Sequence, residues 1–297
     1  RILDSFTSPL FLSFANPHGG GAVVSLIFKC GDDLRQDELA LACMRVLDEA
    51  WQAAGLNLDT ASYSVCSTGV TSGFIEVVPD AETTASIQRA HGGVAGALKK
   101  TPLADWLRAQ ARATTSDEAS AAAKFDAQVD TFARSTAASC VSSYVLGVGD
   151  RHNDNVMITR DGRLFHIDYA HFLGNVLRFG AFNRDKSPFV FTPYMAHVLG
   201  GEDEESAPHF RQFVRWAQRA YLVSREQATL LFVLFRGLLC TGIPQLTPEA
   251  IRYLSTTLQL QEESETAAAD AFKALIHISL RTKNQQVNEV AHLLAHS

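Results

Sequence analysis

Three features are scarce in this sequence: long apolar runs, patterned cysteines and excess positive charge. No uninterrupted apolar run is long enough to span a bilayer. The five cysteines are scattered, which fits reduced thiols in the cytosol and gives no zinc pattern. The formal net charge of −6 argues against a general nucleic-acid-binding protein, so we expect no nucleic-acid partner. Contact with an anionic surface would therefore need a local basic patch.

The composition is otherwise that of a soluble globular protein. Hydrophobic residues make up 46% of the sequence and charged residues 20%, and 297 residues suffice for a large core divided into about two lobes. The first residues do not form a signal peptide, and the chain does not begin with methionine. We expect a cytoplasmic segment of something longer.

Polar groups are most concentrated between residues 147 and 172, which read GVGDRHNDNVMITRDGRLFHIDYAHF. Two short apolar runs, 156–159 and 164–167, flank Asp161-Gly162 and predict a β-hairpin with a tight turn. The hairpin would hold Asn155 and Asp168 at one end of paired strands. An amide oxygen and a carboxylate suit Mg²⁺, which takes oxygen ligands together with phosphate. The plain alternative is a surface hairpin with solvated charges.

This stretch also resembles a known family. DRHNDN followed by HIDYAHF is similar to the catalytic loop and metal-binding motif of phosphoinositide 3-kinases, which carry DRH where protein kinases carry HRD. The resemblance implies ATP and Mg²⁺ as cofactors, with Asn155 and Asp168 as the metal ligands. His152 would accept the proton of the lipid hydroxyl or stabilise charge, alone or with His171. Asp150 and Arg151 would orient the loop.

The N-terminal part predicts strands at 9–16 and 22–29 and a helix at 35–53, whose apolar residues recur at helical spacing. The string FKCGDDLRQDELAL within it resembles the family's FKxGDDLRQD. On that resemblance Lys29 contacts the ATP phosphates, with Asp37 pairing with it or with nearby polar groups. Arg35 and Gln36 are interpreted as structural. A solvated lysine at a strand end is the plain alternative.

The remaining ATP contacts also depend on the resemblance. Ser5 falls where the family has its phosphate-covering loop, but Thr7 stands where a lysine is usual, which puts one phosphate contact in doubt. Two further strands are predicted at 61–67 and 73–78. The ATP-binding residues implied by the resemblance in and after these strands are Tyr63, Glu76, Val77, Val78, Met157 and Ile167.

After Pro79 the sequence predicts mainly helices. A short helix is expected to start at Asp80 and Glu82, and a mobile connection is expected at 112–120. A long helix is expected at 121–144, and later helices near 210–221, 226–239, 262–278 and 285–295. The apolar segments 210–221 and 226–239 are expected to be buried. Thr247 followed by Pro248 predicts a capped helix start.

These elements predict an α+β, bilobal, protein-kinase-like fold. Residues 1–79 would form the β-rich N-lobe, ending in the hinge, and residues 80–297 a helical C-lobe with the catalytic loop and activation segment. The resemblance covers almost the whole chain. It is nearest to class II in the string GAFNRDKSPFVFTPYMAHVL, whereas His171 matches class I. The family's scaffold domains are not visible here, so regulatory domains or subunits are expected outside this segment.

The implied reaction moves the γ-phosphoryl of ATP to the 3-hydroxyl of a phosphoinositide at a membrane surface, by a peripherally associated enzyme. Three cations in the activation segment, Arg178, Arg184 and Lys186, would bind the head group. Asn183 and the run 174–178 lack cations that the resemblance leads one to expect. Phosphatidylinositol and its 4-phosphate are therefore the expected substrates, with little activity on the 4,5-bisphosphate.

Three other interpretations stay open. A phosphoinositide 4-kinase shares several motifs, and a protein kinase of the related superfamily is the second alternative. The third is a catalytically impaired scaffold, because Ala170 stands where the family has glycine. If residue 170 needs a positive φ, alanine costs on the order of 1 kcal/mol there.

Overall fold

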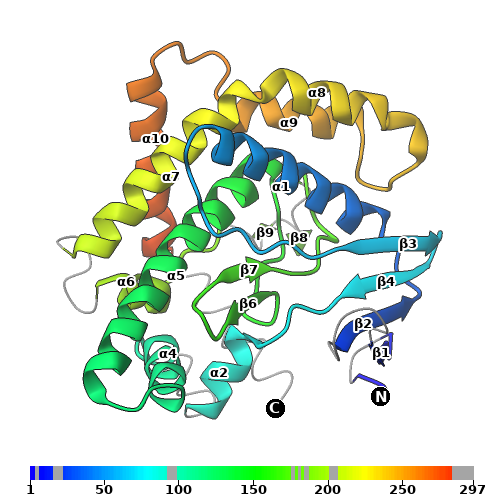
Figure 1. Cartoon of the computed structure of the whole chain (residues 1–297). Coiled ribbons are helices and arrows are strands. Elements are labelled where there is room, and N and C mark those ends of the chain that lie inside the picture. Colours follow the sequence, from blue (N-terminus) through cyan, green and yellow to red (C-terminus); the bar gives the residue numbers. More distant parts are fainter. Residues whose placement is uncertain are drawn as a thin grey trace.

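The computed structural model describes residues 1–3, 7–15, 23–91, 99–174, 178–179, 182–183, 187–200 and 207–282. Figure 1 shows a four-stranded sheet on one side and a larger, mainly helical part on the other, with α1 lying along both. The α+β architecture with a sheet-containing N-lobe and a helical C-lobe is therefore confirmed. The helices within the described ranges lack the combination of length and apolar character that a bilayer crossing requires.

The N-lobe sheet is antiparallel, with the strand order β1-β2-β4-β3. Lys29 pairs with Gly73 across β2 and β4. A Cβ atom at Gly73 would lie 2.5 Å from the Cys66 carbonyl oxygen, so only glycine allows strand β3 to approach this closely. The strands are β1 Leu10–Ala15, β2 Val23–Cys30, β3 Val65–Gly69 and β4 Ser72–Glu76.

Helix α1 (Arg35–Ala53) fastens the N-lobe to the helical part, and its predicted bounds are confirmed. Its buried side chains recur every four residues, at Leu39, Cys43, Leu47 and Trp51, as an amphipathic helix requires. The Trp51 indole Nε1 donates to the Ala220 carbonyl oxygen at 2.9 Å. Because that acceptor lies in α7 (Pro208–Glu226), the C-terminal end of α1 is attached to the C-lobe.

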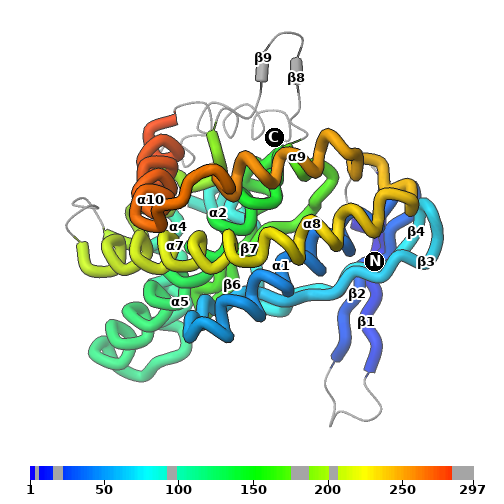
Figure 2. The backbone as a smooth tube through the Cα atoms, turned by 90° about the horizontal axis from the view of Figure 1, so that it is seen from above, coloured from blue at the N-terminus to red at the C-terminus, as the bar shows by residue number. Residues whose placement is uncertain are grey.

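The C-lobe is arranged around α5 (Glu118–Leu146), which runs through its centre in Figures 1 and 2. Helix α5 ends at Gly147 in a left-handed conformation (φ 59°), and a Cβ there would lie 2.3 Å from the Gly174 backbone nitrogen. The other helices are α2 Thr84–Ala90, α4 Pro102–Ala113, α6 Pro193–Gly200, α7 Pro208–Glu226, α8 Ala228–Gly237, η1 Leu239–Thr241, α9 Pro248–Thr257 and α10 Glu265–Arg281. Thr247 caps α9 as predicted, since its hydroxyl accepts from the Ala250 N–H.

The predicted hairpin is present in a second sheet of three antiparallel strands, β5 (Ala81–Thr83), β6 (Val156–Thr159) and β7 (Leu164–His166). Met157 pairs with Phe165 across the hairpin. The short strands β8 (Arg178–Phe179) and β9 (Phe182–Asn183) pair with each other.

The helix expected to start at Asp80 and Glu82 is wrong in its position. Residues 81–83 instead form β5, because they pair with β6 as a third strand of the hairpin sheet. The helix that follows begins only at Thr84, where the Thr83 hydroxyl accepts from the Ser86 N–H. The sheet thereby ties the segment that follows Pro79 to the hairpin that carries Asn155.

Three further expectations need correction. The connection expected at 112–120 shrinks to four residues, because α4 extends to Ala113 and Asp117 caps α5 through the Ser120 N–H. Strand β3 begins at Val65, four residues later than expected. Helix α8 is only partly buried, since Leu230 and Val233 are 46% and 64% exposed. The helix expected at 285–295 lies outside the described residues.

Candidate functional site

A cavity of about 510 Å³ lies where the N-lobe sheet meets the β6–β7 hairpin. Side chains from β2, β4, α1 and both strands of the hairpin reach it. It brings together most of the residues that the resemblance assigns to ATP and metal: Lys29, Asp37, Tyr63, Glu76, Val77, Val78, Asn155, Met157, Ile167 and Asp168. Segments from positions 29 to 168 of the sequence thus converge on one site.

Part of the cavity lining is apolar, with side chains from both sheets. Ile27 and Ile75 come from the N-lobe sheet, and Met157 and Ile167 come from the hairpin and the residue after it; an apolar lining of this kind suits a flat aromatic base. The sequence interpretation missed several lining residues: Leu3, Pro9, Ile27, Val65, Ile75, Thr83, Asp154 and Phe165. Strand alternation could have found Ile27, which lies two residues from Lys29 on the same face of β2. Leu3 and Pro9 carry no comparable signal.

The lining also includes charged side chains. Lys29 forms an ion pair with Asp32, with 2.9 Å between Nζ and Oδ2, so of the two roles expected for Asp37 the structure shows the contact with nearby polar groups. Burial alone would lower the pKa of Lys29, but the hydrogen bond to Asp32 and the nearby Asp168 carboxylate raise it. Lys29 is thus a permanent cation beside the proposed metal ligands.

Asp37 instead turns toward the hairpin. Its Oδ1 accepts from the Tyr169 backbone N–H at 2.9 Å. Burial raises the pKa of Asp37 to about 6, against the opposing effect of that hydrogen bond. The carboxylate therefore fixes the residue that follows Asp168.

The two proposed metal ligands sit at the cavity end of the hairpin. Asn155 is buried, and its Nδ2 donates to the Asp150 carbonyl oxygen at 3.1 Å, which leaves its amide oxygen as the atom that could hold a cation. Asp168 is exposed. An amide oxygen, one carboxylate and a neighbouring lysine fit Mg²⁺ bound together with phosphate, because Mg²⁺ needs few protein ligands in such sites. The donor set therefore fits the ion that the resemblance implies.

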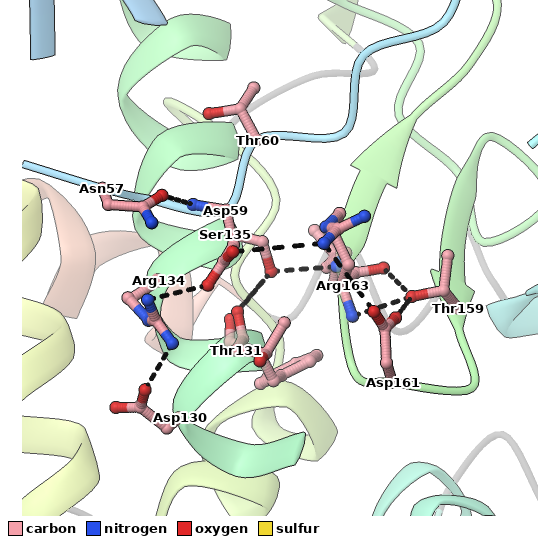
Figure 3. Close-up of polar contacts among 12 residues, drawn as sticks. Asn57, Asp59, Thr60, Asp130, Thr131, Arg134, Ser135, Thr159, Asp161 and Arg163 are labelled. Carbon is pink, nitrogen blue, oxygen red and sulfur yellow. Dashed lines mark hydrogen bonds and ion pairs between the residues drawn. The ribbon is translucent and has the colours of Figure 1, made fainter. Parts of the chain in front are cut away.

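The far end of the hairpin is fixed by a polar network with α5 (Figure 3). Asp59 accepts from Arg134 at 2.9 Å and lies 4.0 Å from an Arg163 nitrogen. The Ser135 hydroxyl accepts from the Leu164 N–H at 2.9 Å. Since the hairpin is fixed at its turn, the position of its open end, and of Asn155 there, is set by α5.

Arg151 connects the catalytic loop to the end of β7. Its Nη1 donates to the Ile167 carbonyl oxygen at 2.6 Å, and its Nη2 donates to the carbonyl oxygen of Asp168. These contacts agree with the predicted orienting role. Asp150, with a φ of 52°, Arg151, His152 and His171 do not line the described cavity. The two histidines are half-buried beside it, and the His171 carbonyl accepts from the Gly149 N–H at 2.9 Å.

Two glutamines hold the segment after Asp168, and the sequence interpretation identified only one as structural. Gln36 is 4% exposed, and its Nε2 donates to the carbonyl oxygens of Tyr169 and Ala170 at 2.8 and 2.7 Å. Gln245 donates to the same Ala170 oxygen and accepts from the Phe172 N–H at 3.0 Å. Gln245 stands 75 residues away, and no local pattern predicts its contact.

Ala170 does not have the positive φ that was considered as a possible source of strain. It is absent from the residues with a positive φ, whereas Asp168 has a φ of 62° and Leu173 one of 53°. The condition under which alanine would be unfavourable at residue 170, a positive φ, is therefore not met in this structure. The left-handed residue of the motif is the aspartate itself, a residue type that tolerates this region better than most.

Four predicted residues cannot be placed in full. Ser5, Arg184 and Lys186 lie outside the described residues, and of Arg178 only the backbone in β8 is described. The phosphate-covering loop and the head-group cations thus remain sequence predictions.

Known proteins match the chain along its length. The family model "Phosphatidylinositol 3- and 4-kinase" matches residues 23–247. Phosphatidylinositol 3-kinase 1 of Dictyostelium discoideum is 44% identical over all of this chain and 18% of its own length. The human phosphatidylinositol 4-phosphate 3-kinase C2 domain-containing subunit beta is 41% identical over 98% of this chain and 17% of its own length.

The chain therefore spans less than a fifth of the length of these two relatives. Phosphatidylinositol 3-kinase 3 of Dictyostelium discoideum shows the same relation, with 41% identity over the whole chain and 17% of the relative. The chain belongs to the phosphatidylinositol 3- and 4-kinase family, a family of ATP-dependent lipid kinases.

Proposed function

We propose that this chain transfers the γ-phosphoryl group of ATP to the 3-hydroxyl of an inositol lipid. The observation that supports the proposal is one cavity lined both by apolar side chains from the two sheets and by Lys29, Asn155 and Asp168. An adenine base against the apolar side chains would direct its phosphates toward the charged side chains. Positioning and charge stabilisation of this kind account for most of the catalysis of phosphoryl transfer.

Each of these side chains has a proposed role in the phosphoryl transfer. Asn155 and Asp168 hold Mg²⁺, which when bound offsets the charge of the phosphates. Lys29 adds a permanent positive charge, and Asp32 keeps its ammonium group in place. His152, half-buried beside the cavity, takes the proton of the lipid hydroxyl. Arg151 and Asp37 hold the residues on either side of Asp168, and Ser5 is proposed to cover the phosphates.

The proposed lipid substrates are phosphatidylinositol and phosphatidylinositol 4-phosphate. The run 174–178 contains one cation, Arg178, and residue 183 is asparagine, which leaves Arg184 and Lys186 as the other cations. A hydrogen bond to a charged group contributes roughly 1.5–3 kcal/mol. Few such partners would favour head groups with one ring phosphate or none. The name of the human relative also includes phosphatidylinositol 4-phosphate.

The same proposal covers location and partners. The chain would act as a cytoplasmic enzyme at the surface of a membrane, without nucleic acid. Its relatives extend far beyond the matched region, so domains or subunits outside this segment would regulate it and direct it to a membrane.

The test is turnover on phosphatidylinositol, its 4-phosphate and its 4,5-bisphosphate in matched vesicles at fixed salt, with the product position determined. Fixed salt is needed because vesicle charge alone recruits basic surfaces. Phosphorylation at the 3-position of the first two lipids is the expected result. A 4-phosphate product from phosphatidylinositol would instead identify a 4-kinase, and ATP binding without any transfer would identify a scaffold. Changing Val176 and Leu177 to lysine should shift activity toward the bisphosphate.

A further inference from the structure

A second cavity, of about 340 Å³, lies far from the first, in a groove between α7 and α10. Figures 1 and 2 both show these helices packed together at the side of the C-lobe opposite β1 and β2. The cavity is lined by Phe210, Arg211, Val214, Arg215, Gln218, Lys273 and His277. Its lining thus contains three cationic side chains and a histidine, but no carboxylate.

Helical spacing explains why these cations gather. Arg211 and Arg215 are four residues apart on α7, so they share one face, and Lys273 and His277 repeat the spacing on α10. Because the two helices pack together, both faces border one groove. Arg219 and Arg281 extend the two rows by one more step each. The proposal needs only the cations that line the cavity.

Compensating charge is sparse within the described parts of the chain. No ion pair there joins a carboxylate to Arg211, Arg215 or Lys273, although Asp270 is one turn away from Lys273 on α10. The one described contact of Arg215 is a hydrogen bond to the neutral Gln212. Such a cluster is unexpected in a chain with a net charge of −6, since like charges repel unless a ligand offsets them.

The shape of the cavity limits what it could bind. A flat membrane would contact projecting side chains, whereas a concave groove of this size favours a compact anion that inserts between the helices. Phe210 and Val214 are buried and provide apolar contact for a ring. Arginine favours phosphate because its planar fork can donate two hydrogen bonds to one group.

We propose that the groove between α7 and α10 binds a compact, multiply phosphorylated ring, through Arg211, Arg215 and Lys273. The ring is either a soluble inositol phosphate or the head group of a phosphorylated lipid. The site is separate from the ATP cavity, and the proposal does not depend on kinase activity.

The test compares two double variants with equal loss of charge. Arg211→Gln with Lys273→Gln removes two groove cations. Arg45→Gln with Arg236→Gln removes two exposed cations on α1 and α8, away from the groove. Binding of inositol 1,4,5-trisphosphate is measured by calorimetry on the whole chain. The whole chain is needed because it includes the four acidic residues at 202–205, which precede α7 in the sequence and lie outside the described residues. The second measurement uses phosphatidylcholine vesicles with and without phosphatidylinositol 4,5-bisphosphate.

We expect the groove variant to bind the trisphosphate about tenfold or more weakly, and the control variant to bind within about threefold of the unmodified chain. A ligand in the ATP cavity would not distinguish the two variants. Groove-dependent binding of vesicles but not of the trisphosphate would assign the site to the lipid form. Equal losses in both variants would show attraction by net charge alone and overturn the proposal. Absence of binding to both probes would overturn it as well.

Discussion

Asn155 and Asp168 stand at the same end of one hairpin, yet their surroundings differ. Asn155 is 7% exposed, its side chain donates to the Asp150 carbonyl, and its own carbonyl accepts from the Ile167 N–H at 3.1 Å. Asp168 is exposed and has a left-handed backbone. Its side chain has one described backbone contact, the Ala170 N–H at 3.3 Å. The proposed amide ligand is thus fixed by its own loop, whereas the proposed carboxylate ligand depends on its neighbours for its position.

Those neighbours come from three distant parts of the chain. Arg151 holds the Asp168 carbonyl, Asp37 holds the Tyr169 N–H, and Gln36 and Gln245 hold the next carbonyl oxygens. An exposed carboxylate can exchange its bound water for a metal ion that also binds phosphate. The hydrogen bonds of the neighbouring backbone keep this carboxylate at the cavity. The difference indicates that Asn155 would hold the metal ion from a fixed position, whereas the side chain of Asp168 could move when the ion binds.

The largest effect should follow from Asp168→Asn. Asparagine tolerates the left-handed backbone, so the change removes the charge and spares the conformation. We expect essentially all Mg²⁺-dependent transfer to be lost, because the variant lacks the one carboxylate proposed to hold the metal ion. The measurement is lipid phosphorylation at saturating ATP and Mg²⁺, with circular dichroism to confirm folding.

Asp161→Asn is the matched control, because Asp161 lies at the turn of the same hairpin and away from the cavity (Figure 3). Its removal should change the rate by less than about threefold. A folded Asp168→Asn variant with near-normal turnover would contradict the assignment of Asp168 as a metal ligand.

A smaller but still large effect is expected from His152→Ala, a change in the loop that holds Asn155. The Asn155 N–H bonds to the carbonyl of residue 152 at 2.9 Å, and alanine keeps that carbonyl. Loss of a proton acceptor costs about 10²–10⁴-fold in rate. ATP affinity, measured by equilibrium binding, should stay within about threefold.

The matching change His171→Ala tests whether the second histidine shares the role. If His152→Ala lowers only the thermal midpoint or only ATP binding, the residue orders the loop and takes no part in proton transfer. A comparable fall in rate for both variants would assign the chemistry to the pair.

The sequence predicted the parts of the site that local patterns encode. The Asp-Gly turn between two apolar runs located the hairpin, and helical spacing located α1. Family resemblance placed Lys29 and Tyr63 at the cavity. Contacts between distant segments were harder to predict: Asp37 accepts from the Tyr169 N–H, 132 residues away, and Gln245 donates to the Ala170 carbonyl from a loop with no motif. Strand β5 was read as a helix because its pairing with β6 is a tertiary contact, which overrides local propensity.

An intermediate effect is expected when the support of Asp168 is weakened. Gln36→Leu keeps the volume but removes the donor to the Tyr169 and Ala170 carbonyls, and Gln245→Leu removes the other donor to Ala170. A net hydrogen bond contributes about 1 kcal/mol, which is about fivefold, so each change should raise the Mg²⁺ concentration for half-maximal rate by at least about fivefold. The measurement is rate against Mg²⁺ at saturating ATP.

Gln128→Leu serves as the control for a buried glutamine. Its Nε2 donates to the Arg160 carbonyl at 2.7 Å, near the turn end of the hairpin. It should lower the free energy of unfolding and leave the Mg²⁺ dependence unchanged. In the double variant of Gln36 and Gln245, non-additive effects are expected because both donate to the same Ala170 oxygen. Strictly additive effects would show that the glutamines act independently.

The smallest effect is expected from Ala170→Gly, which restores the glycine of the family motif. Ala170 has no positive φ, so glycine relieves no strain in this conformation, and the carbonyl held by the two glutamines is unchanged. Added backbone freedom should lower stability by at most about 1 kcal/mol. We therefore expect the rate and the Mg²⁺ dependence to stay within about twofold of the unmodified chain. A gain of tenfold or more would show that residue 170 must become left-handed during turnover, and that the supported segment after Asp168 rearranges to work.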